Sequence, residues 1–419
     1  PAVAQHHGLG QGGHVALESR GMWQGREVGV PGQVGNAPVG DVSATVIKRT
    51  AWQVPQHLRR QHKGDDGTTM PSNWNRATPE AAGFAANLER KLAAGFESGL
   101  LLPIHALLVA RTGKLVLEQY FEGEDETWGD TLGRVQFGPE VLHDLRSVTK
   151  SIVGLLYGIA LERGLVPPLQ APVIDGFPEY PDLVADPERR KVTVAHTLTM
   201  TMGMEWDENK PYTDPTNSEI AMEMAADRYR FILDRPIIGA PGEKWVYSGG
   251  AVALIGALIE RGSGRKLPDF AREVLFAPLG ITDFYWLAGS DGVASPASGL
   301  RLTAPDLLRI GAMLVDGGRH EGRQVVPEAW IEASWTPAIQ TWDGLGYGHL
   351  WYIHEAPAPG YAKPLRWIAA FGNGGQRLWL APEAGLACVI YAGDYNLFDR
   401  WVTPARIWRE IVVGNVVRA

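Results

Sequence analysis

Two apolar strand–turn–strand segments, far apart in the chain, limit most strongly how this sequence can fold. Residues 104–121 (IHALLVARTGKLVLEQYF) hold two apolar runs around a turn at Arg111-Thr112-Gly113, and residues 376–393 (QRLWLAPEAGLACVIYAG) hold a similar pair. An amphipathic helix is expected after the second pair, over residues 400–413. Strands at both ends of the chain indicate one sheet domain that the middle of the chain interrupts.

The middle of the chain has a different pattern. Between Ser151 and about Ser298, the sequence favours helices and long loops over strands. We therefore predict an α+β fold in which a mostly helical domain is inserted into a sheet domain. The expected parts are an irregular N-terminal segment over residues 1–74, a sheet domain over 75–150 and 299–419, and the helical domain over 151–298.

Charge and apolar content exclude several classes of protein. The chain has 419 residues, is 45% hydrophobic and carries a formal net charge of −8. Its apolar content suffices for a large core, and its acidic balance argues against a nucleic-acid surface. No apolar run approaches the roughly 20 residues that span a bilayer. We therefore expect a soluble globular protein whose partner is a small molecule. The single cysteine, Cys388, excludes an internal disulfide and is expected in a buried strand.

The N-terminal stretch carries two ambiguous signals. Residues 2–4 (AVA) are similar to the small-residue end of a secretory signal, which favours export without assigning a compartment. The histidines of QHHGLGQGGH fit either a metal ligand set or a Gly-rich tail, and the glycines favour the tail. No HExxH or CxxC spacing occurs, so no metal site is predicted. Ordered structure is expected from Pro79, since residues 79–98 have helix-forming composition.

The chain contains two serine–lysine pairs at the spacing that suits a lysine-activated serine. Ser147 and Lys150 open a segment whose apolar residues recur at helical spacing, so both are expected on one face of a buried helix that ends near Gly164. Ser263 and Lys266 instead follow a predicted helix, within a glycine turn. Context therefore favours the first pair as a site and makes the second a coincidence.

The chemistry explains why this context matters. A serine hydroxyl is a weak nucleophile, so an adjacent base has to accept its proton, and a lysine does so only as an uncharged amine. Burial in an apolar helix suits Lys150 for this role, whereas in the alternative Ser147 merely caps the helix and Lys150 extends into solvent. Tyr247, just before a second apolar helix, is a candidate to pass the proton onward if a nearby cation lowers its pKa.

Several motifs together resemble one superfamily, the serine β-lactamase-like hydrolases. This superfamily includes class C β-lactamases, penicillin-binding peptidases, family VIII carboxylesterases and 6-aminohexanoate-dimer hydrolases. The resemblance runs from about Trp74 to the C-terminus. It implies a β-lactamase/transpeptidase-like fold, an α/β/α sandwich whose antiparallel sheet is built from both chain ends. The motifs occur in the family's order: SVTK at 147–150, YSGG at 247–250, SGLRLTAPDLLRIGAMLVDGG at 298–318 and FGNGGQRLWLAP at 371–382.

The resemblance also implies roles for individual residues. Ser147 matches the nucleophile, Lys150 its base and Tyr247 the tyrosine of the second motif. The third motif falls on residues 370–372 (AFG), so that Gly372 lines the substrate site. The backbone N–H groups of Ser147 and Asn373 would then form the oxyanion hole. In the alternative, residues 372–376 (GNGGQ) are a plain loop before a strand.

Two departures from the family bear on the substrate. Class C β-lactamases carry asparagine where this chain has Gly249, and the third motif lacks its usual cation. Both favour a simple ester or amide over a penicillin. The segment MEWDENKPYTDPTNSEI is similar to one in 6-aminohexanoate-dimer hydrolases, in which the tyrosine matching Tyr212 binds the scissile amide; packing is the alternative role. His349 and His354 are expected near the site without a catalytic role, and five aromatic residues fit either a cleft wall or hairpin packing: Trp342, Tyr347, Trp351, Tyr352 and Trp367.

The sequence therefore predicts a serine hydrolase that cleaves small esters or amides through an acyl-enzyme and needs no cofactor. Short esters are expected to react best, because they need little beyond a nucleophile and an oxyanion hole. A β-lactamase, a D-alanyl-D-alanine peptidase and a non-catalytic protein that binds a peptide or acyl ligand are the alternatives. The sequence does not assign an oligomeric state.

Overall fold

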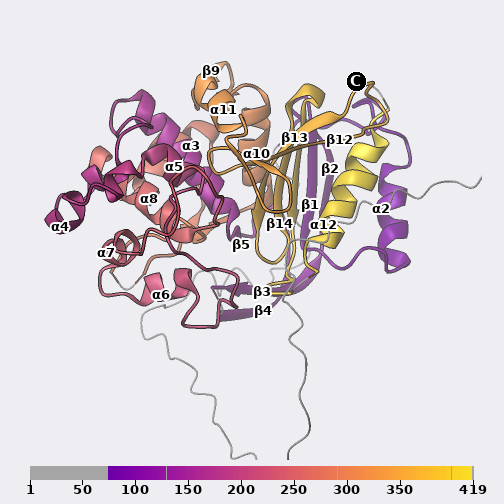
Figure 1. Cartoon of the computed structure of the whole chain (residues 1–419). Coiled ribbons are helices and arrows are strands. Elements are labelled where there is room, and N and C mark those ends of the chain that lie inside the picture. Colours follow the sequence, from indigo (N-terminus) through magenta and orange to yellow (C-terminus); the bar gives the residue numbers. More distant parts are fainter. Residues whose placement is uncertain (1–73, 129, 290, 398, 418–419) are drawn as a thin grey trace, which may run out of the picture.

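The largest element of the structure is an eight-stranded antiparallel sheet, seen in a computed structural model that describes residues 74–128, 130–289, 291–397 and 399–417 (Figure 1). Its strand order is β10-β11-β12-β13-β14-β15-β1-β2. The pairing of β1 with β15, from Ala106 opposite Tyr391 to Arg111 opposite Leu386, joins the two ends of the chain, as predicted. The strands are β1 (Ala106–Arg111), β2 (Lys114–Tyr120), β10 (Ile339–Gln340), β11 (Gly346–Tyr347), β12 (Tyr352–Ala356), β13 (Leu365–Gly372), β14 (Gln376–Ala381) and β15 (Leu386–Tyr391).

The turn between β1 and β2 shows why the sequence forms a hairpin there. Thr112 and Gly113 both have positive φ, 49° and 73°, as two-residue hairpin turns require. Glycine adopts this conformation without strain. The Thr112 hydroxyl donates a hydrogen bond to the carbonyl oxygen of Arg111, at 2.8 Å. The backbone N–H of Thr112 donates to the carbonyl oxygen of Gly385. The turn is therefore tied to the neighbouring β14–β15 connection.

Both faces of the sheet are covered by helices. Successive side chains of β1 enter opposite cores: Leu108 packs with the helices that follow Ser147, and Leu107 with the two ends of the described chain. Figure 1 shows α3 (Val148–Glu162) and α10 (Ala304–Val315) on one face, and α2 (Leu88–Glu97) and α12 (Val402–Arg406) on the other. These layers confirm the expected α/β/α sandwich.

The predicted terminal helices occur, with different bounds. The first covers only Leu88–Glu97 of the expected residues 79–98. The second continues from α12 as a π-helical stretch, Ile407–Val412, and a 3₁₀ turn, Val413–Asn415. The indole of Trp408 from this stretch stacks on Trp379 of β14, with ring centroids 5.5 Å apart, which fixes the helix to the sheet.

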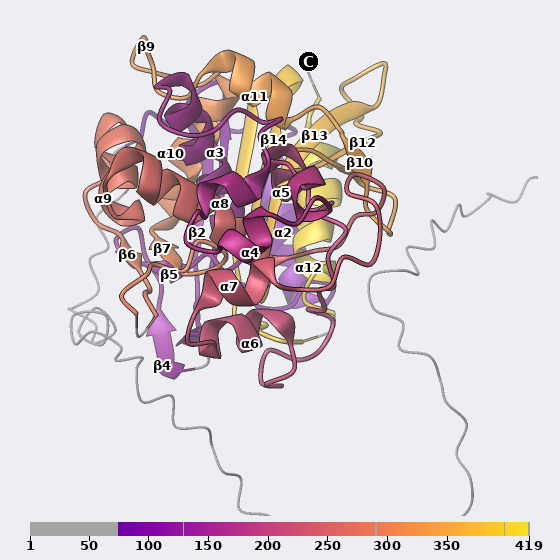
Figure 2. The ribbon, with the colours of Figure 1, turned by 60° about the vertical axis from the view of Figure 1, so that its left-hand side comes forward.

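The middle of the chain is mostly helical, as expected. Figure 2 shows α8 (Gly249–Ser263) among the surrounding helices, and it packs directly on α3. No helix in the part of the chain that the structure describes is long and apolar enough to cross a membrane. The remaining α-helices here are α4 (Pro181–Val184), α5 (Val194–Leu198), α6 (Ser218–Met224), α7 (Arg228–Leu233) and α9 (Leu267–Ala271). A π-helical stretch covers Arg272–Phe276, and 3₁₀ helices cover Val173–Gly176, Arg189–Lys191 and Ala277–Leu279.

Two small sheets lie beside the start of α3. One contains β5 (His143–Asp144), β7 (Leu300–Leu302) and β6 (Tyr285–Trp286), so the residues before Ser147 pair with the strand that follows the helical insertion. The other is the hairpin of β3 (Glu122–Thr127) and β4 (Asp130–Gln136). The sequence analysis did not anticipate this hairpin, because its strands are too polar for the alternating apolar pattern.

A few elements complete the second half of the chain. They are α11 (Glu328–Ser334) and a two-stranded sheet of β8 (Arg319–His320) and β9 (Arg323–Gln324). Almost all of the predicted irregular segment, residues 1–74, lies outside the described residues, and so do the histidines of QHHGLGQGGH.

Candidate active site

Ser147 lies at the turn where α3 begins. Arg146, immediately before it, has a left-handed backbone conformation with φ 47°, which makes the chain turn sharply into the helix. Ser147 is half-buried, and its side chain does not form a capping hydrogen bond with the helix. Instead, its Oγ accepts a hydrogen bond from Lys150 Nζ at 3.2 Å. The predicted helix and the predicted contact are both present, and the capping alternative for Ser147 is wrong.

Lys150 points into the protein rather than into solvent. Its side chain is only 2% exposed, and Nζ donates a second hydrogen bond to the carbonyl oxygen of Ala297 at 2.9 Å. Nζ also lies 4.8 Å from the centroid of the Tyr247 ring. The amine is therefore held between the nucleophile and the predicted third group, within proton-transfer distance of Ser147.

Tyr247 precedes α8, whose first turn is capped by the Ser248 hydroxyl accepting a hydrogen bond from the N–H of Ala251 at 3.0 Å. The Tyr247 side chain is hydrogen bonded to that of Ser147. Desolvation, and then the charge of Glu208, raise the pKa of the Tyr247 hydroxyl well above its usual value, although the bond to Ser147 opposes this. The condition that a nearby cation lowers this pKa is therefore not met, and the protonated phenol suits a proton donor better than a base.

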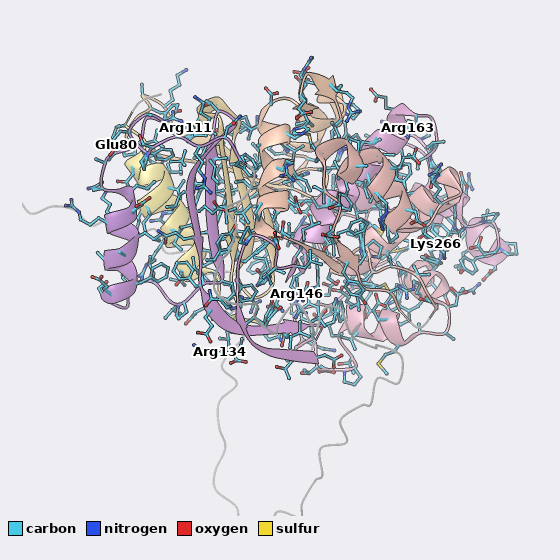
Figure 3. All side chains as sticks on the ribbon, turned by 180° about the vertical axis from the view of Figure 1, so that it is seen from behind. Glu80, Arg111, Arg134, Arg146, Arg163 and Lys266 are labelled. Carbon is cyan, nitrogen blue, oxygen red and sulfur yellow. The ribbon has the colours of Figure 1, made fainter. Side chains whose placement is uncertain are left out.

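The second serine–lysine pair lies elsewhere. Helix α8 includes Ser263, one residue beyond the expected end, and Gly264 closes the helix with φ 67°. Lys266 is exposed. Figure 3 shows it on the outer side of the helical part, away from Arg146, which is the neighbour of Ser147. This pair has no buried base and forms no site.

The end of β13 approaches the nucleophile through Gly372. A Cβ on Gly372 would lie 2.5 Å from the carbonyl oxygen of Leu145 and 3.2 Å from Cβ of Arg146, so only glycine allows this contact. Asn373 follows directly. Its side chain makes two hydrogen bonds with Asn396. Nδ2 of Asn373 donates to Oδ1 of Asn396 at 2.7 Å, and Oδ1 of Asn373 accepts from the backbone N–H of Asn396 at 2.9 Å. The segment predicted to complete an oxyanion hole is thus packed against the residues before Ser147.

A cluster of buried charges supports the turn before Ser147. The Arg146 guanidinium pairs with Glu126 at 2.5 Å and with Asp144 at 3.4 Å, and it lies over the ring of Tyr395. The Arg146 backbone N–H donates to Oδ1 of Asp144 at 2.8 Å. These contacts hold a left-handed arginine in place, which compensates for its strained backbone.

Two buried carboxyl groups, which the sequence analysis missed, meet at Gly249. The backbone N–H of Gly249 donates to Oε1 of Glu208, which also accepts from the Trp206 indole at 2.6 Å. The Glu219 carboxyl lies against the α carbon of Gly249, since a Cβ there would be 2.8 Å from its Cδ. Burial, and then the charge of Glu219, raise the pKa of Glu208 to about 8. In the sequence, both glutamates belong to polar loop stretches, where nothing distinguishes them from surface residues.

Tyr212 is connected to this pair of carboxyl groups. Its hydroxyl donates a hydrogen bond to Oε2 of Glu208 at 3.2 Å, and its pKa is raised well above the usual value, by desolvation and then by the charge of Glu208. The charges of Glu219 and Tyr247 raise this pKa further. Tyr212 is therefore half-buried beside the site, held by a polar contact rather than by apolar packing alone.

The aromatic residues divide into two groups. Tyr347 and Tyr352 contact Trp245, at centroid distances of 5.5 and 6.4 Å, and Trp245 contacts Tyr247 at 5.9 Å. These side chains form a continuous aromatic wall that reaches Tyr247. The other three predicted residues do not belong to it: Trp342 is 52% exposed, Trp351 packs on Trp335, and Trp367 packs in the core on the opposite face of the sheet.

The histidines and the cysteine are structural. His349 stacks on Trp330 of α11, where burial lowers its pKa to about 4. His354 is exposed on β12, with its ring against Trp367. In the part of the chain that the structure describes, no hydrogen bond or ion pair joins either imidazole to Ser147 or Lys150. Cys388 is buried in β15, as predicted, and burial raises the pKa of its thiol. Among the described residues, no group of three His, Cys, Asp or Glu side chains could hold a metal ion.

Ser147 is hydrogen bonded to a lysine at the start of a buried helix, and this helix packs against an antiparallel sheet. These features define a serine hydrolase of the β-lactamase fold. The chain belongs to the beta-lactamase family, whose model matches residues 92–399. It is 27% identical over 334 residues to 6-aminohexanoate-dimer hydrolase of Paenarthrobacter ureafaciens, a match that covers 74% of this chain and 76% of the relative.

Two further comparisons agree with this assignment. Esterase EstB of Burkholderia gladioli is 30% identical over 210 residues, which cover 48% of this chain and 52% of EstB. Among solved structures, a putative 6-aminohexanoate-dimer hydrolase from Bacillus anthracis superimposes with a TM-score of 0.62 at 16% identity, and the match covers 85% of this chain and 93% of that one. At that level of identity, the structural match supports the fold alone.

Proposed function

We propose that this chain hydrolyses small esters or amides through an acyl-enzyme on Ser147. The observation that carries the proposal is the 3.2 Å hydrogen bond between Lys150 Nζ and Ser147 Oγ, with Lys150 almost fully buried. In the proposed reaction, Lys150 accepts the hydroxyl proton while Oγ attacks the substrate carbonyl. The N–H groups of Ser147 and Asn373 bind the oxyanion that forms.

The departure of the leaving group, which completes the acyl-enzyme, uses the protonated phenol. The Tyr247 hydroxyl donates a proton to the leaving alkoxide or amine, and takes the proton from Lys150 in exchange. Water then attacks the acyl-enzyme, and the same three groups return Ser147 to its free form. The raised pKa of Tyr247 supports this order, because the hydroxyl stays protonated until the leaving group needs its proton.

Features around Gly249 support a simple ester or amide as the substrate. Glu219 fills the space where class C β-lactamases carry an asparagine side chain, and Ala370 stands where the third motif has its cation. A penicillin would lose polar contacts at both places. The name of the relative from Paenarthrobacter ureafaciens supports amide cleavage and that of EstB supports ester cleavage. Tyr212, beside Tyr247, is the residue we propose to contact an amide.

A fluorophosphonate probe tests the proposal. An activated serine reacts with it, so the wild type should be labelled, Ser147→Ala should not, and Ser263→Ala should be labelled like the wild type. A parallel assay with p-nitrophenyl esters, 6-aminohexanoate oligomers and a cephalosporin would identify the bond that is cut. Absence of labelling in the wild type would favour the non-catalytic binding alternative, and a cephalosporin that reacts faster than any ester would favour the β-lactamase alternative.

A further inference from the structure

Arg377 of β14 is a buried cation for which the site described so far has no use. Its side chain is about 5% exposed, and among the described residues no carboxylate forms an ion pair with it. Its guanidinium carbon lies 4.8 Å from the centroid of the Phe371 ring. Burial, and then the positive charge of Arg400, lower the pKa of Arg377 to about 9. A buried charge without a counter-charge is costly, so its position calls for a reason.

The hydrogen bonds of Arg377 show where its charge acts. Nη1 donates to the carbonyl oxygen of Gly372 at 2.9 Å and to that of Gln376 at 2.7 Å. The Gly372 carbonyl belongs to the same peptide unit as the backbone N–H of Asn373. A cation that donates to the oxygen of a peptide draws electron density from its nitrogen, so the N–H on the other side becomes a stronger donor. That N–H is the proposed second donor of the oxyanion hole.

The peptide unit that follows, between Asn373 and Gly374, is held as well. Gln376 Nε2 donates to the carbonyl oxygen of Asn373 at 3.3 Å, and the Asn373 side chain is bound to Asn396. Gly372 itself packs against the carbonyl oxygen of Leu145. Rotation of the Gly372–Asn373 peptide would break several of these contacts together, so the direction of its N–H is set before a substrate arrives.

We propose that Arg377 is a positioning residue of the oxyanion hole: through the Gly372 carbonyl it orients and polarises the peptide whose N–H binds the developing oxyanion. The inference rests on the proposed function. Arg377 also provides a positive charge close to the third motif, which has no cation of its own at Ala370. Arg377 does not touch the substrate in this role, and all of its effect passes through Asn373.

The test compares Arg377→Met, Arg377→Lys and the control Arg366→Met. Arg366 lies on the adjacent strand β13 and also donates to a backbone carbonyl, that of Trp335, which is not part of the site. For a p-nitrophenyl ester, Arg377→Met should lower kcat by about 10-fold, less than the loss of a whole oxyanion donor, and leave KM within about 2-fold. Arg377→Lys should lie between Arg377→Met and the wild type, and Arg366→Met should match the wild type.

A spectroscopic measurement separates polarisation from a structural effect. The carbonyl stretch of an acyl-enzyme, labelled with carbon-13 and measured by infrared difference spectroscopy, moves to lower frequency as the oxyanion hole binds it more strongly. Arg377→Met should move this band to higher frequency, and Arg366→Met should not. A folded Arg377→Met variant with wild-type kcat and an unchanged band would overturn the role of Arg377.

The outcomes also separate this inference from the proposed function. If Arg377→Met does not fold, Arg377→Lys decides, since it keeps the charge but lacks the planar donor fork, and an unchanged band in that variant overturns the inference. A wild-type enzyme that forms no acyl-enzyme on Ser147 would overturn the proposed function and the role of Arg377 together. An acyl-enzyme that forms normally while Arg377 variants behave as the wild type overturns only the latter.

Discussion

The carboxyl group of Glu219 occupies the place of a side chain on Gly249: a Cβ on that glycine would lie 2.8 Å from Glu219 Cδ. Glu219 is 1% exposed, and its Oε1 accepts a hydrogen bond from the Ser298 hydroxyl at 3.3 Å, so it has little freedom to withdraw. Gly249 and Glu219 therefore belong together: the Glu219 carboxyl group, from α6, lies where an asparagine at position 249 would place its carboxamide.

Gly249→Asn should consequently destabilise the fold rather than restore β-lactamase activity. Overpacking against Glu219 should cost about 1–3 kcal/mol in the free energy of unfolding, measured by urea denaturation. The double variant Gly249→Asn/Glu219→Ala should recover part of this loss, because the space is then free. Equal stability of Gly249→Asn and the wild type would show that Glu219 moves aside, contrary to this account.

Ser147→Ala should abolish turnover of p-nitrophenyl esters, and Ser263→Ala should leave it within about 3-fold of the wild type. Lys150→Ala should be nearly as severe as Ser147→Ala, because residues that act as one unit contribute non-additively. Far-ultraviolet circular dichroism would establish that the variants are folded. A similar loss in both serine variants would refute the assignment of the nucleophile.

Tyr247→Phe removes a single hydroxyl from the contact with Ser147 and leaves the ring beside Lys150. If that hydroxyl delivers the proton to the leaving group, kcat should fall by about 10²-fold or more. The loss should shrink as the leaving group becomes a weaker base, since a good leaving group departs without a proton. A uniform, small loss across p-nitrophenyl and alkyl esters would instead make Tyr247 a packing residue.

The raised pKa of Glu208, about 8, makes stability depend on pH. An unfolded glutamate titrates near 4.3, so between about pH 4.5 and 8 the folded state keeps a proton that the unfolded state has released. Stability therefore falls as pH rises through this window, by at most about 1.4 kcal/mol per pH unit from this group.

Glu208→Gln should remove this dependence, so the variant should gain stability relative to the wild type as the pH rises from 5 to 8. Urea unfolding at each pH measures the difference. Glu205→Gln is the matched control, because Glu205 is an exposed carboxylate three residues earlier. Parallel pH curves for Glu208→Gln and the wild type would contradict a buried, protonated Glu208.

Tyr212→Phe should separate the two kinds of substrate. The variant loses the hydroxyl that donates to Glu208 and faces the region of Tyr247. Cleavage of 6-aminohexanoate oligomers should fall by about 10-fold, the effect of one lost hydrogen bond of roughly 1.4 kcal/mol, while cleavage of p-nitrophenyl esters should change little. An equal loss for both kinds of substrate would indicate that Tyr212 supports the fold of the loop instead.

The parts of this molecule that could be predicted from sequence depend on neighbours along the chain. The Thr112-Gly113 turn and the contact of Ser147 with Lys150 each follow from a few adjacent residues and a known period. The same reasoning separated Ser147 from Ser263, because burial of α3 is visible in its apolar pattern. Strands at both ends of the chain predicted one sheet domain with a helical insertion, and the layers of the sandwich were predicted from the resemblance to the serine β-lactamase-like hydrolases.

The parts that were missed depend on contacts between distant segments. Glu208 from a loop and Glu219 from α6 are buried where both meet Gly249, which is far from them in the sequence. The direction of the Tyr247 pKa shift depends on its burial and on the charge of Glu208, and the sequence around Tyr247 reveals neither. Trp351 and Trp367 are aromatic like the residues of the wall, so the sequence does not separate them from it. Only the folded sheet shows that Trp351 belongs to one core and Trp367 to the other.

The pairing of β1 with β15 has a consequence for the synthesis of this protein. Strand β1 leaves the ribosome about 280 residues before its partner, which at 5–20 residues per second is a delay of roughly 15 to 55 s. Until Leu386–Tyr391 arrives, one edge of β1 presents unpaired backbone groups and apolar side chains such as Leu107 and Val109. During this delay β1 can pair only with β2, and its other edge stays open to pairing with another chain.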